Sequence, residues 1–240
     1  MKILLTGTSS GIGKDLLEYL SRKKHEVYVI NRKKTDGPYI NEFICDLSNI
    51  NELKRLSTKL RKINFDVLIN NAASGKVEDF EKLTSEDLKY EFSLNTIAPI
   101  TLIQILLPNM LKNKYGKILN ISSISAKEGT PYLYTYSASK AALDSFTQSL
   151  AKTYTSKGVR INSICLGGID TQMSKGGRQK ISLLRGLSPE KYQNSMIEKM
   201  GRTNLISAKD LMEVFDFYIT QKSDIISGQS INICGTLELR

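Results

Sequence analysis

The sequence predicts a single α/β domain built on a parallel sheet. Its 240 residues, of which 40% are hydrophobic, suffice for one well-packed domain. The chain begins with an apolar run at residues 2–5, a glycine-rich turn, a helical pattern and a second apolar run, which is the order of a βαβ unit with parallel strands. The segment at residues 66–73 contains an unbroken apolar run at 67–69, which is typical of a strand buried on both faces, as parallel strands usually are.

The composition argues against several classes of partner. The chain has 34 Lys and Arg residues against 24 Asp and Glu residues, which gives a net charge of +10. They are scattered along the chain without the interleaved aromatic residues of a stacking platform, so we predict no nucleic-acid partner. The charge indicates a solvated basic surface, an anionic substrate or an acidic partner. No apolar run is long enough to cross a membrane, and the apolar start is too short for a signal peptide, so we expect a cytoplasmic protein without a membrane partner.

The three cysteines, Cys45, Cys165 and Cys234, lie in apolar, strand-like stretches and show no metal-ligand spacing. This pattern is typical of small buried hydrophobic side chains. We therefore predict no metal site.

The first strand leads into a glycine-rich turn at residues 6–13 and then a helix at residues 14–24. Such a turn points backbone N–H groups and the positive end of a helix dipole at a phosphate, and a Cβ at the glycine positions would hold the phosphate away. The spacing is G-x-x-x-G-x-G and not the commoner G-x-G-x-x-G, and a purely structural turn is the alternative. The candidate cofactor-binding residues here are Gly7, Ser9, Ser10, Gly11, Ile12 and Gly13.

The second strand, residues 25–31, ends where a dinucleotide places its adenosine ribose. An acidic residue at this point selects NAD, whereas a cation accommodates the 2′-phosphate of NADP. The chain has Asn31 and Arg32 followed by two lysines, and no carboxylate. The sequence therefore favours NADP(H) over NAD(H), with a solvated basic loop as the alternative explanation.

The third strand, residues 39–46, precedes a helix at residues 49–62, and the fourth strand ends in two amides and two small residues. Asp46 could cap the helix, hold the adenine amino group of a cofactor, or do both. The candidate cofactor-binding residues at these two strand ends are Asp46, Leu47, Asn71 and Ala72.

Long helices follow over residues 85–112. They contain Asn95, with Pro99 four residues later. We expect Pro99 to kink the helix and Asn95 to bridge the freed backbone groups through water.

The fifth strand, residues 117–122, leads to Ser123, and a helix follows from Tyr136 to about residue 157. Tyr136 and Lys140 are four residues apart, so their side chains lie on one helix face. A neighbouring ammonium group favours the phenolate and lowers the Tyr pKa from about 10 towards the range of a general acid or base. Ser123 could hold a carbonyl oxygen while Tyr136 delivers the proton. The alternative is an ordinary surface pair of Tyr136 and Lys140.

The sixth strand, residues 160–166, ends in a second glycine turn that suits another contact with the cofactor. From there to the C-terminus the pattern predicts an irregular, mobile substrate loop or lid at about residues 172–203, a helix at 208–218 and a last strand at 229–234. The candidate cofactor-binding residues of this turn are Gly167, Ile169 and Thr171.

In this order the motifs resemble those of the short-chain dehydrogenase/reductase family, of the ordinary type, over nearly the whole chain. The motifs are Thr6-Gly7-x-x-x-Gly11-Ile12-Gly13, Asp46-Leu47, Asn70-Asn71-Ala72, Asn95, Ser123, Tyr136-x-x-x-Lys140 and Gly167-Gly168-Ile169-x-Thr171. The resemblance implies a single doubly wound, Rossmann-type domain over residues 1–240, with about seven parallel strands and helices on both faces. It also implies a homodimer or homotetramer, assembled through the long helices. Leu166 departs from the family, which commonly has Pro there.

The resemblance implies that the chain interconverts a carbonyl and a secondary alcohol by hydride transfer with NADP(H). Tyr136 would be the acid/base, Lys140 would lower its pKa and hold the nicotinamide ribose, and Ser123 would orient the substrate carbonyl. Asn95 would hold a water that links Lys140 to solvent. The alternative is a catalytically silent nucleotide-sensing or regulatory protein on the same fold, which the retention of both Tyr136 and Lys140 disfavours.

The substrate is not fixed by these motifs. Similarity to the 3-oxoacyl-carrier-protein reductases favours a 3-oxoacyl or keto-sugar type of small molecule. Cations in the segment 175–191 indicate an anionic or carrier-linked substrate, with Arg178 and Arg185 as candidate contacts. The residues expected to shape the pocket are Ser74, Gly75, Lys127, Tyr132, Tyr134, Met173 and that basic segment.

Overall fold

The computed structural model describes residues 1–237, and its strands form one seven-stranded sheet in which all pairings are parallel. The order is β3-β2-β1-β4-β5-β6-β7, so the sheet grows outward from β1 in both directions. The strands are β1 (Lys2–Thr6), β2 (Glu26–Asn31), β3 (Asn41–Ile44), β4 (Val67–Asn70), β5 (Gly116–Ser123), β6 (Val159–Leu166) and β7 (Ser230–Ile233). This is the predicted doubly wound arrangement.

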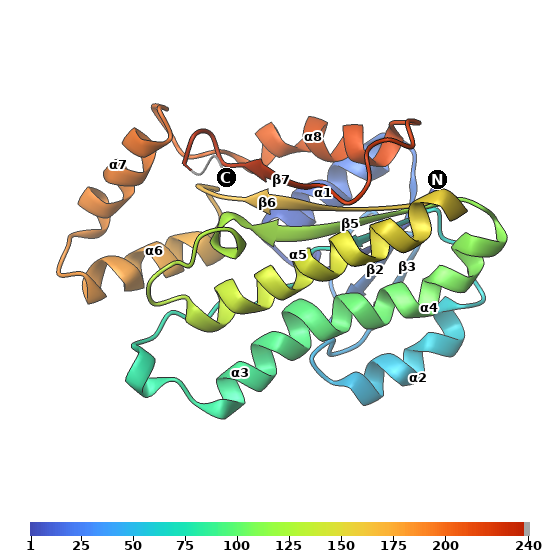
Figure 1. Ribbon diagram of the computed structural model, residues 1–240, viewed down its shortest axis with the longest axis horizontal. Coiled ribbons are helices and arrows are strands. Elements are labelled where there is room, and N and C mark those ends of the chain that lie inside the picture. The colour runs from blue at the N-terminus through green and yellow to red at the C-terminus, as the bar shows by residue number, and fades with distance from the viewer. Residues whose placement is uncertain (238–240) are drawn as a thin grey trace.

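Helices cover both faces of the sheet, as Figure 1 shows. Helices α1 and α8 lie on one face, and α2, α4 and α5 lie on the other. The helices are α1 (Gly11–Arg22), α2 (Ile50–Leu60), α3 (Ser85–Phe92), α4 (Ala98–Lys112), α5 (Tyr134–Tyr154), α6 (Gln172–Leu184), α7 (Pro189–Lys199) and α8 (Ala208–Thr220). Each helix that covers the sheet forms part of a crossover connection between two parallel strands.

The hydrophobic core has two parts, one on each face of the sheet. Successive strand residues point to opposite faces. In β1, Leu4 therefore joins the cluster beneath α2 and α4, while Ile3 and Leu5 join the cluster beneath α1 and α8. All three side chains are fully buried. The apolar side chains of the strands thus pack against a helical layer on each face of the sheet. The carboxyl ends of the strands lie outside this core and can carry polar side chains.

Helices α3 and α4 join through a π-helical turn, Ser93–Ile97, in which the Ala98 N–H group donates to the carbonyl of Ser93, five residues earlier. Pro99 lies four residues after Asn95, has no N–H group for the Asn95 carbonyl and crowds it, which favours this wider turn. Where the sequence predicted a kink caused by Pro99, the structure therefore has a π-helical turn. The combined helix Ser85–Lys112 is long enough to cross a membrane, and its most apolar 18-residue window has a mean hydropathy of 1.4. That window is 56% buried within the fold, as in a core helix.

The prediction of an irregular segment at residues 172–203 is wrong, because most of it forms α6 and α7. Helix α6 begins with a capping box between Thr171 and Ser174, and α7 begins with Ser188 as N-cap and Pro189 in its first turn. Both are recognised helix-start signals in the sequence. The two helices lie beyond the carboxyl edge of the sheet (Figure 1).

Candidate active site

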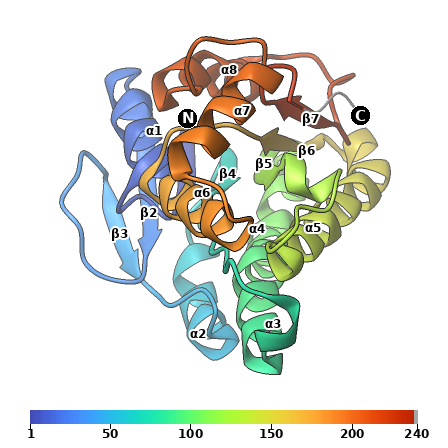
Figure 2. The same ribbon diagram turned by 90° about the vertical axis from the view of Figure 1, so that its left-hand side faces the viewer.

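The four candidate catalytic side chains come from three parts of the fold. Ser123 is the last residue of β5, Tyr136 and Lys140 lie in the first two turns of α5, and Asn95 lies in the π-helical turn. Helix α5 packs against β5, β6, α3 and the π-helical turn, which brings these residues to the carboxyl edge of the sheet. Figure 2 looks onto this edge, with α6 in front of the strands between α1 and α5.

Tyr136 is half-buried, and its phenol is hydrogen-bonded to the hydroxyl group of Ser123. Burial raises the pKa of Tyr136 to about 12, and the hydrogen bond with Ser123 offsets only part of this rise. The structure therefore does not show the lowered pKa predicted for Tyr136. Because its pKa is raised, the phenol keeps its proton at neutral pH. The ammonium group of Lys140 lies 5.9 Å from the centre of the Tyr136 ring.

Lys140 is buried, with 2% of its surface exposed, and its ammonium group donates a 2.6 Å hydrogen bond to the carbonyl of Ile121. Burial lowers the pKa of Lys140 to about 8, while the charges of Asp144 and other neighbours act in the opposite direction. A solvated surface pair of Tyr136 and Lys140 is therefore excluded. Placing a desolvated amine beside the phenol costs folding free energy, which is typical of a functional site.

Asn95 is fully buried and holds the chain segment that follows β4. Its side-chain oxygen accepts from the N–H group of Ser74 at 3.0 Å, and its amide donates to the Ser74 carbonyl at 2.8 Å and to the Ser139 hydroxyl at 3.0 Å. Ser139 in turn donates to the Tyr136 carbonyl at 2.8 Å. Asn95 thus connects the Ser74 backbone to the second turn of α5 and, through Ser139, to the Tyr136 carbonyl.

The glycine turn after β1 has the shape that a pyrophosphate requires. Gly7 and Gly11 have φ angles of +72° and +56°, and a Cβ on Gly13 would lie 2.1 Å from the Gly7 carbonyl oxygen. The N-cap Ser10 of α1 makes no side-chain capping bond, so its first-turn N–H groups are available to a ligand. The exposed Ser9 and Ser10 and the half-buried Ile12 complete a cradle that fits a dinucleotide phosphate.

Asn71 and Ala72, predicted as cofactor contacts, also brace this turn. The Asn71 side chain donates to the carbonyls of Thr6 and Gly7, both at 2.9 Å. The backbone N–H groups of Asn71 and Ala72 donate to the Thr6 hydroxyl at 3.0 and 2.9 Å. The strand ends of β1 and β4 are therefore fixed to each other directly beside the cradle.

The end of β2 differs from the expectation in one respect. Asn31 is buried and donates to the Thr8 hydroxyl at 2.8 Å and to the Glu42 carboxylate at 2.9 Å. A carboxylate is thus present at this point, supplied by β3, where the sequence of β2 alone shows none. Glu42 also accepts hydrogen bonds from Thr35 and Tyr39. These hydrogen bonds outweigh burial, which acts to raise the pKa of Glu42, and hold that pKa below its usual range.

Because these donors occupy both of its oxygens, the Glu42 carboxylate organises the loop after β2 and is not free to accept from a ribose. Arg32 and the two lysines that follow it are exposed on that loop. The cations predicted to receive a 2′-phosphate are therefore accessible.

Asp46 does not cap α2. The N-cap is Asn49, whose side chain accepts from the N–H groups of Asn51 and Glu52. Asp46 accepts from the N–H and hydroxyl groups of Ser48 at 2.9 and 2.7 Å, and Leu47 is buried. Both residues shape the turn after β3.

Arg178 of α6 holds the loop after β6 in place. Its guanidinium group donates to the Ile169 carbonyl at 3.1 Å and to the Ser174 hydroxyl at 3.0 Å, and it pairs with Asp170 at 3.3 Å. Arg178 is buried, so the proposed contact between Arg178 and an anionic substrate is not supported. Charge reversal at this position would instead leave buried groups unpaired.

The other residues of this loop are held in place by packing and by the start of α6. A Cβ on Gly167 would lie 2.5 Å from the Ile124 side chain, Ile169 is buried, and Thr171 is the N-cap of α6. Leu166 is buried in β6, opposite Ile233 of β7.

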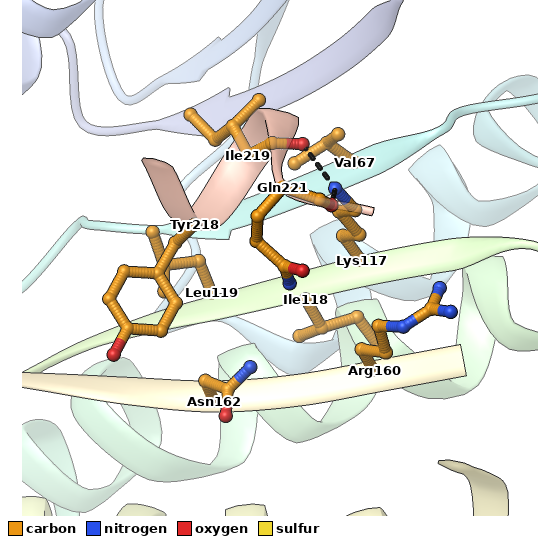
Figure 3. Close-up of a pocket in the computed structure, with 9 residues that line it drawn as sticks. All are labelled: Val67, Lys117, Ile118, Leu119, Arg160, Asn162, Tyr218, Ile219 and Gln221. Carbon is orange, nitrogen blue, oxygen red and sulfur yellow. Dashed lines mark hydrogen bonds between the residues drawn. The ribbon is translucent and has the colours of Figure 1, made fainter. Parts of the chain in front are cut away.

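Two cavities lie at opposite edges of the sheet. An open one of about 430 Å³ borders the loop after β6 and α6, and it is lined by Asp170, Thr171, Gln172, Lys175, Arg178 and Gln193. The other, of only about 10 Å³, lies where β4, β5 and β6 begin (Figure 3). There the buried Lys117 donates to the carbonyls of Ile219 and Gln221 at the end of α8. This second cavity is large enough for about one water. It lies beside Lys117, whose ammonium group caps the end of α8.

A model of the family described as short chain dehydrogenase matches residues 1–182. The chain is 29% identical to the 3-oxoacyl-acyl-carrier-protein reductase of Rickettsia felis, over 97% of this chain and 94% of that protein. It is 31% identical to the 3-ketodihydrosphingosine reductase of Bacteroides thetaiotaomicron, over 82% of this chain and 74% of that protein.

Solved structures share the fold over nearly the full length. A mutant of 4-hydroxyisoleucine dehydrogenase, complexed with NADH and succinate, is 26% identical and has a TM-score of 0.86, covering 99% of this chain and 98% of that chain. A single-substitution variant of actinorhodin polyketide ketoreductase with NADPH is 24% identical and has a TM-score of 0.89, covering 98% of this chain and 96% of that chain.

Proposed function

Because this chain belongs to the short-chain dehydrogenase family, and is thereby an NAD(P)-dependent oxidoreductase that acts on CH–OH or keto groups, we propose that it reduces a 3-oxoacyl type of ketone with NADPH. The observation that carries the proposal is the hydrogen bond between the phenol of Tyr136 and the Ser123 hydroxyl group at the carboxyl edge of the sheet, with the buried ammonium group of Lys140 on the same helix face. Reduction of a ketone needs a proton donor at its oxygen, and a phenol with a raised pKa is in the required state.

The chain's own residues can then carry the proton and the positioning. A ketone oxygen hydrogen-bonded by Ser123 and Tyr136 would receive the Tyr136 proton as the reduced nicotinamide, when bound, supplies a hydride to the carbonyl carbon. The Lys140 ammonium group, on the same helix face, would stabilise the resulting phenolate. Asn95 holds Ser74 and Ser139, and so keeps the start of α5 in register with the segment that follows β4.

An exposed cluster of aromatic residues at the start of α5 and in the segment before α3 supports a substrate with an apolar chain. The rings of Phe80 and Tyr134 meet edge to face with centres 5.6 Å apart, and those of Tyr132 and Tyr134 with centres 6.5 Å apart. Phe80 is 67% exposed and Tyr134 is 39% exposed. Such a surface suits an acyl chain better than a keto-sugar, whose hydroxyl groups require polar partners. Both relatives named above are, by their names, reductases of ketones.

The preference for NADPH rests on Arg32 and the two lysines after it, which are exposed at the end of β2, and on the engagement of Glu42 by Asn31, Thr35 and Tyr39. A carrier-linked substrate is compatible with exposed cations such as Lys175 and Arg185 on α6 and just after it. Arg185 lies 5.5 Å from the centre of the Tyr192 ring of α7.

The test is NADPH and NADH oxidation by the purified protein against 3-oxoacyl thioesters and keto-sugars. We expect faster turnover with NADPH and a thioester, and a fall in kcat of about 10² to 10⁴-fold in Tyr136→Phe with NADPH affinity retained. Tyr154→Phe, at the other end of α5, is the matched control and should behave as wild type. Turnover of keto-sugars alone would replace the substrate class. Tight NADPH binding without turnover of either class would favour a nucleotide-sensing role.

A further inference from the structure

The segment Ser74 to Lys76 forms a wall of the catalytic site. Gly75 lies so close to the catalytic tyrosine that a Cβ on it would be 3.2 Å from Cδ2 of the Tyr136 ring. This contact is tighter than a side chain tolerates without a shift of its neighbour. The position of this segment therefore helps to set the position of the ring.

Two buried side chains of one helix hold this wall at both ends. Asn95 binds the N–H and carbonyl groups of Ser74. Glu91, one helical turn earlier, accepts a 2.5 Å hydrogen bond from the N–H group of Lys76. Residues four apart lie on one helix face, so both reach the same segment. Gly75, between the two anchors, is the residue that meets the Tyr136 ring.

Glu91 is an unusual residue to find at such a position. Only 1% of its surface is exposed, and its second carboxylate oxygen is buried and has no hydrogen-bond partner. The ammonium group of Lys76 does not neutralise it, but pairs with Asp87 at 2.6 Å. A buried carboxylate with an unsatisfied oxygen is costly to keep, and a neutral amide would accept the same backbone hydrogen bond.

We propose that Glu91 is a positioning residue for the catalytic tyrosine, which anchors the wall at Lys76 against the phenol ring and sets, through its charge, the pH at which Tyr136 exchanges its proton. The proposal rests on the proposed role of Tyr136 as the acid. No contact between Glu91 and the substrate is involved.

The charges around Glu91 support this role. The charged or titratable groups that face it are Lys76 from the loop after β4, Asp87 from its own helix, and Lys140 and Tyr136 from α5. Burial raises the pKa of Glu91 to about 7, and Asp87 adds to the rise, while the hydrogen bond from Lys76 and the charges of Lys76 and Lys140 oppose it. The ionised carboxylate raises the pKa of both Tyr136 and Lys140. Glu91 therefore changes its charge near neutral pH.

The experiment compares Glu91→Gln, which keeps an acceptor for Lys76 but removes the charge, with Glu91→Ala, which removes both. Removing a negative charge lowers the pKa of Tyr136. We therefore expect the alkaline limb of kcat/KM for ketone reduction in Glu91→Gln to move to lower pH by on the order of one unit. In Glu91→Ala we expect kcat to fall about 10-fold with the KM for NADPH unchanged, because the wall is released. Glu86→Gln, on the exposed face of α3, is the control.

A second measurement needs no substrate. The phenol carbon of Tyr136, observed by carbon-13 NMR and assigned with Tyr136→Phe, should begin to titrate at lower pH in Glu91→Gln than in wild type. Coincident titrations and an unaltered kcat in Glu91→Ala would overturn the proposal. A shifted titration without turnover of any ketone would leave the role of Glu91 standing and contradict the proposed function instead.

Discussion

Burial acts on the two members of the catalytic pair in opposite directions. It raises the pKa of the neutral acid Tyr136 to about 12 and lowers that of the cationic Lys140 to about 8. Both shifts disfavour the charged form. A phenolate formed during reduction would therefore depend on Ser123, its hydrogen-bond partner, and on the ammonium group of Lys140 on the same helix face.

The cofactor preference can be tested at a single residue, Arg32. We expect Arg32→Ala to raise the KM for NADPH by about 10-fold, since a charge-assisted hydrogen bond to the 2′-phosphate is lost, and to leave the KM for NADH unchanged. Steady-state kinetics with both cofactors measures this. Arg55→Ala, on the exposed face of α2, is the matched control. Equal effects on the two cofactors would show that Arg32 only adds to the general positive field.

Single residues also show how far the sequence predicts the site. Ser123, Tyr136 and Lys140 could be identified from the sequence, because each belongs to a motif whose residue types suit proton transfer. They lie together because α5 packs against β5. The roles of Glu42 and Glu91 could not be predicted, because each depends on pairing between distant segments: β3 beside β2 for Glu42, and α3 beside the loop after β4 for Glu91. The partners of Arg178 are close in the sequence, but their contact with its guanidinium group depends on α6 forming directly after the loop that follows β6. The sequence pattern did not predict α6, so it could not predict this role.

The strands follow from the sequence more directly than the helices do, because parallel strands buried on both faces leave continuous apolar runs. Helices α6 and α7 depart most from the expected structure. Their composition is polar, and α7, which the structure describes in full, has no buried residue, so no apolar face marked it. The signals that were present are local ones, Thr171 with Ser174 and Ser188 with Pro189.

We propose that α6 and α7, within residues 172–203, act as a lid over the substrate. Helix α7, all of which the structure describes, has no buried residue. The polar contacts of α6 with the segments before α3 and α5 include an ion pair of 3.6 Å between Lys180 and Glu78 and a long hydrogen bond from Tyr132 to the Leu184 carbonyl. Elements with few buried contacts, such as α7, open at low free-energy cost. We expect fast amide hydrogen exchange in residues 172–203 and clear slowing when NADPH and a ketone analogue are bound. The core strand β5 is the internal control, and equal exchange in both states would contradict a lid.

The whole molecule leaves apolar side chains exposed on the side formed by α3, α4 and α5. They are Leu88, Tyr90, Ile97 and Phe146, of which Ile97 and Phe146 are each 46% exposed. Helix α5 contacts both α4 and the π-helical turn that carries Ile97, so these side chains belong to neighbouring helices. An exposed apolar patch across neighbouring helices is typical of a subunit interface. The predicted homo-oligomer would bury this patch, and the same helices carry Asn95 and Tyr136.

Assembly can therefore be tested by placing a charge on this patch. We expect light scattering after size exclusion to show a dimer or tetramer for wild type and a mass near the 26.9 kDa of one chain for Phe146→Asp, because an unpaired charge buried in an interface costs several kcal/mol. Ile225→Asp, at an 83% exposed position between α8 and β7, should stay assembled. A monomeric wild type, or an assembled Phe146→Asp variant, would locate the interface elsewhere or remove it. If kcat falls together with assembly, the interface also supports the register of α5 that places Tyr136 beside Ser123.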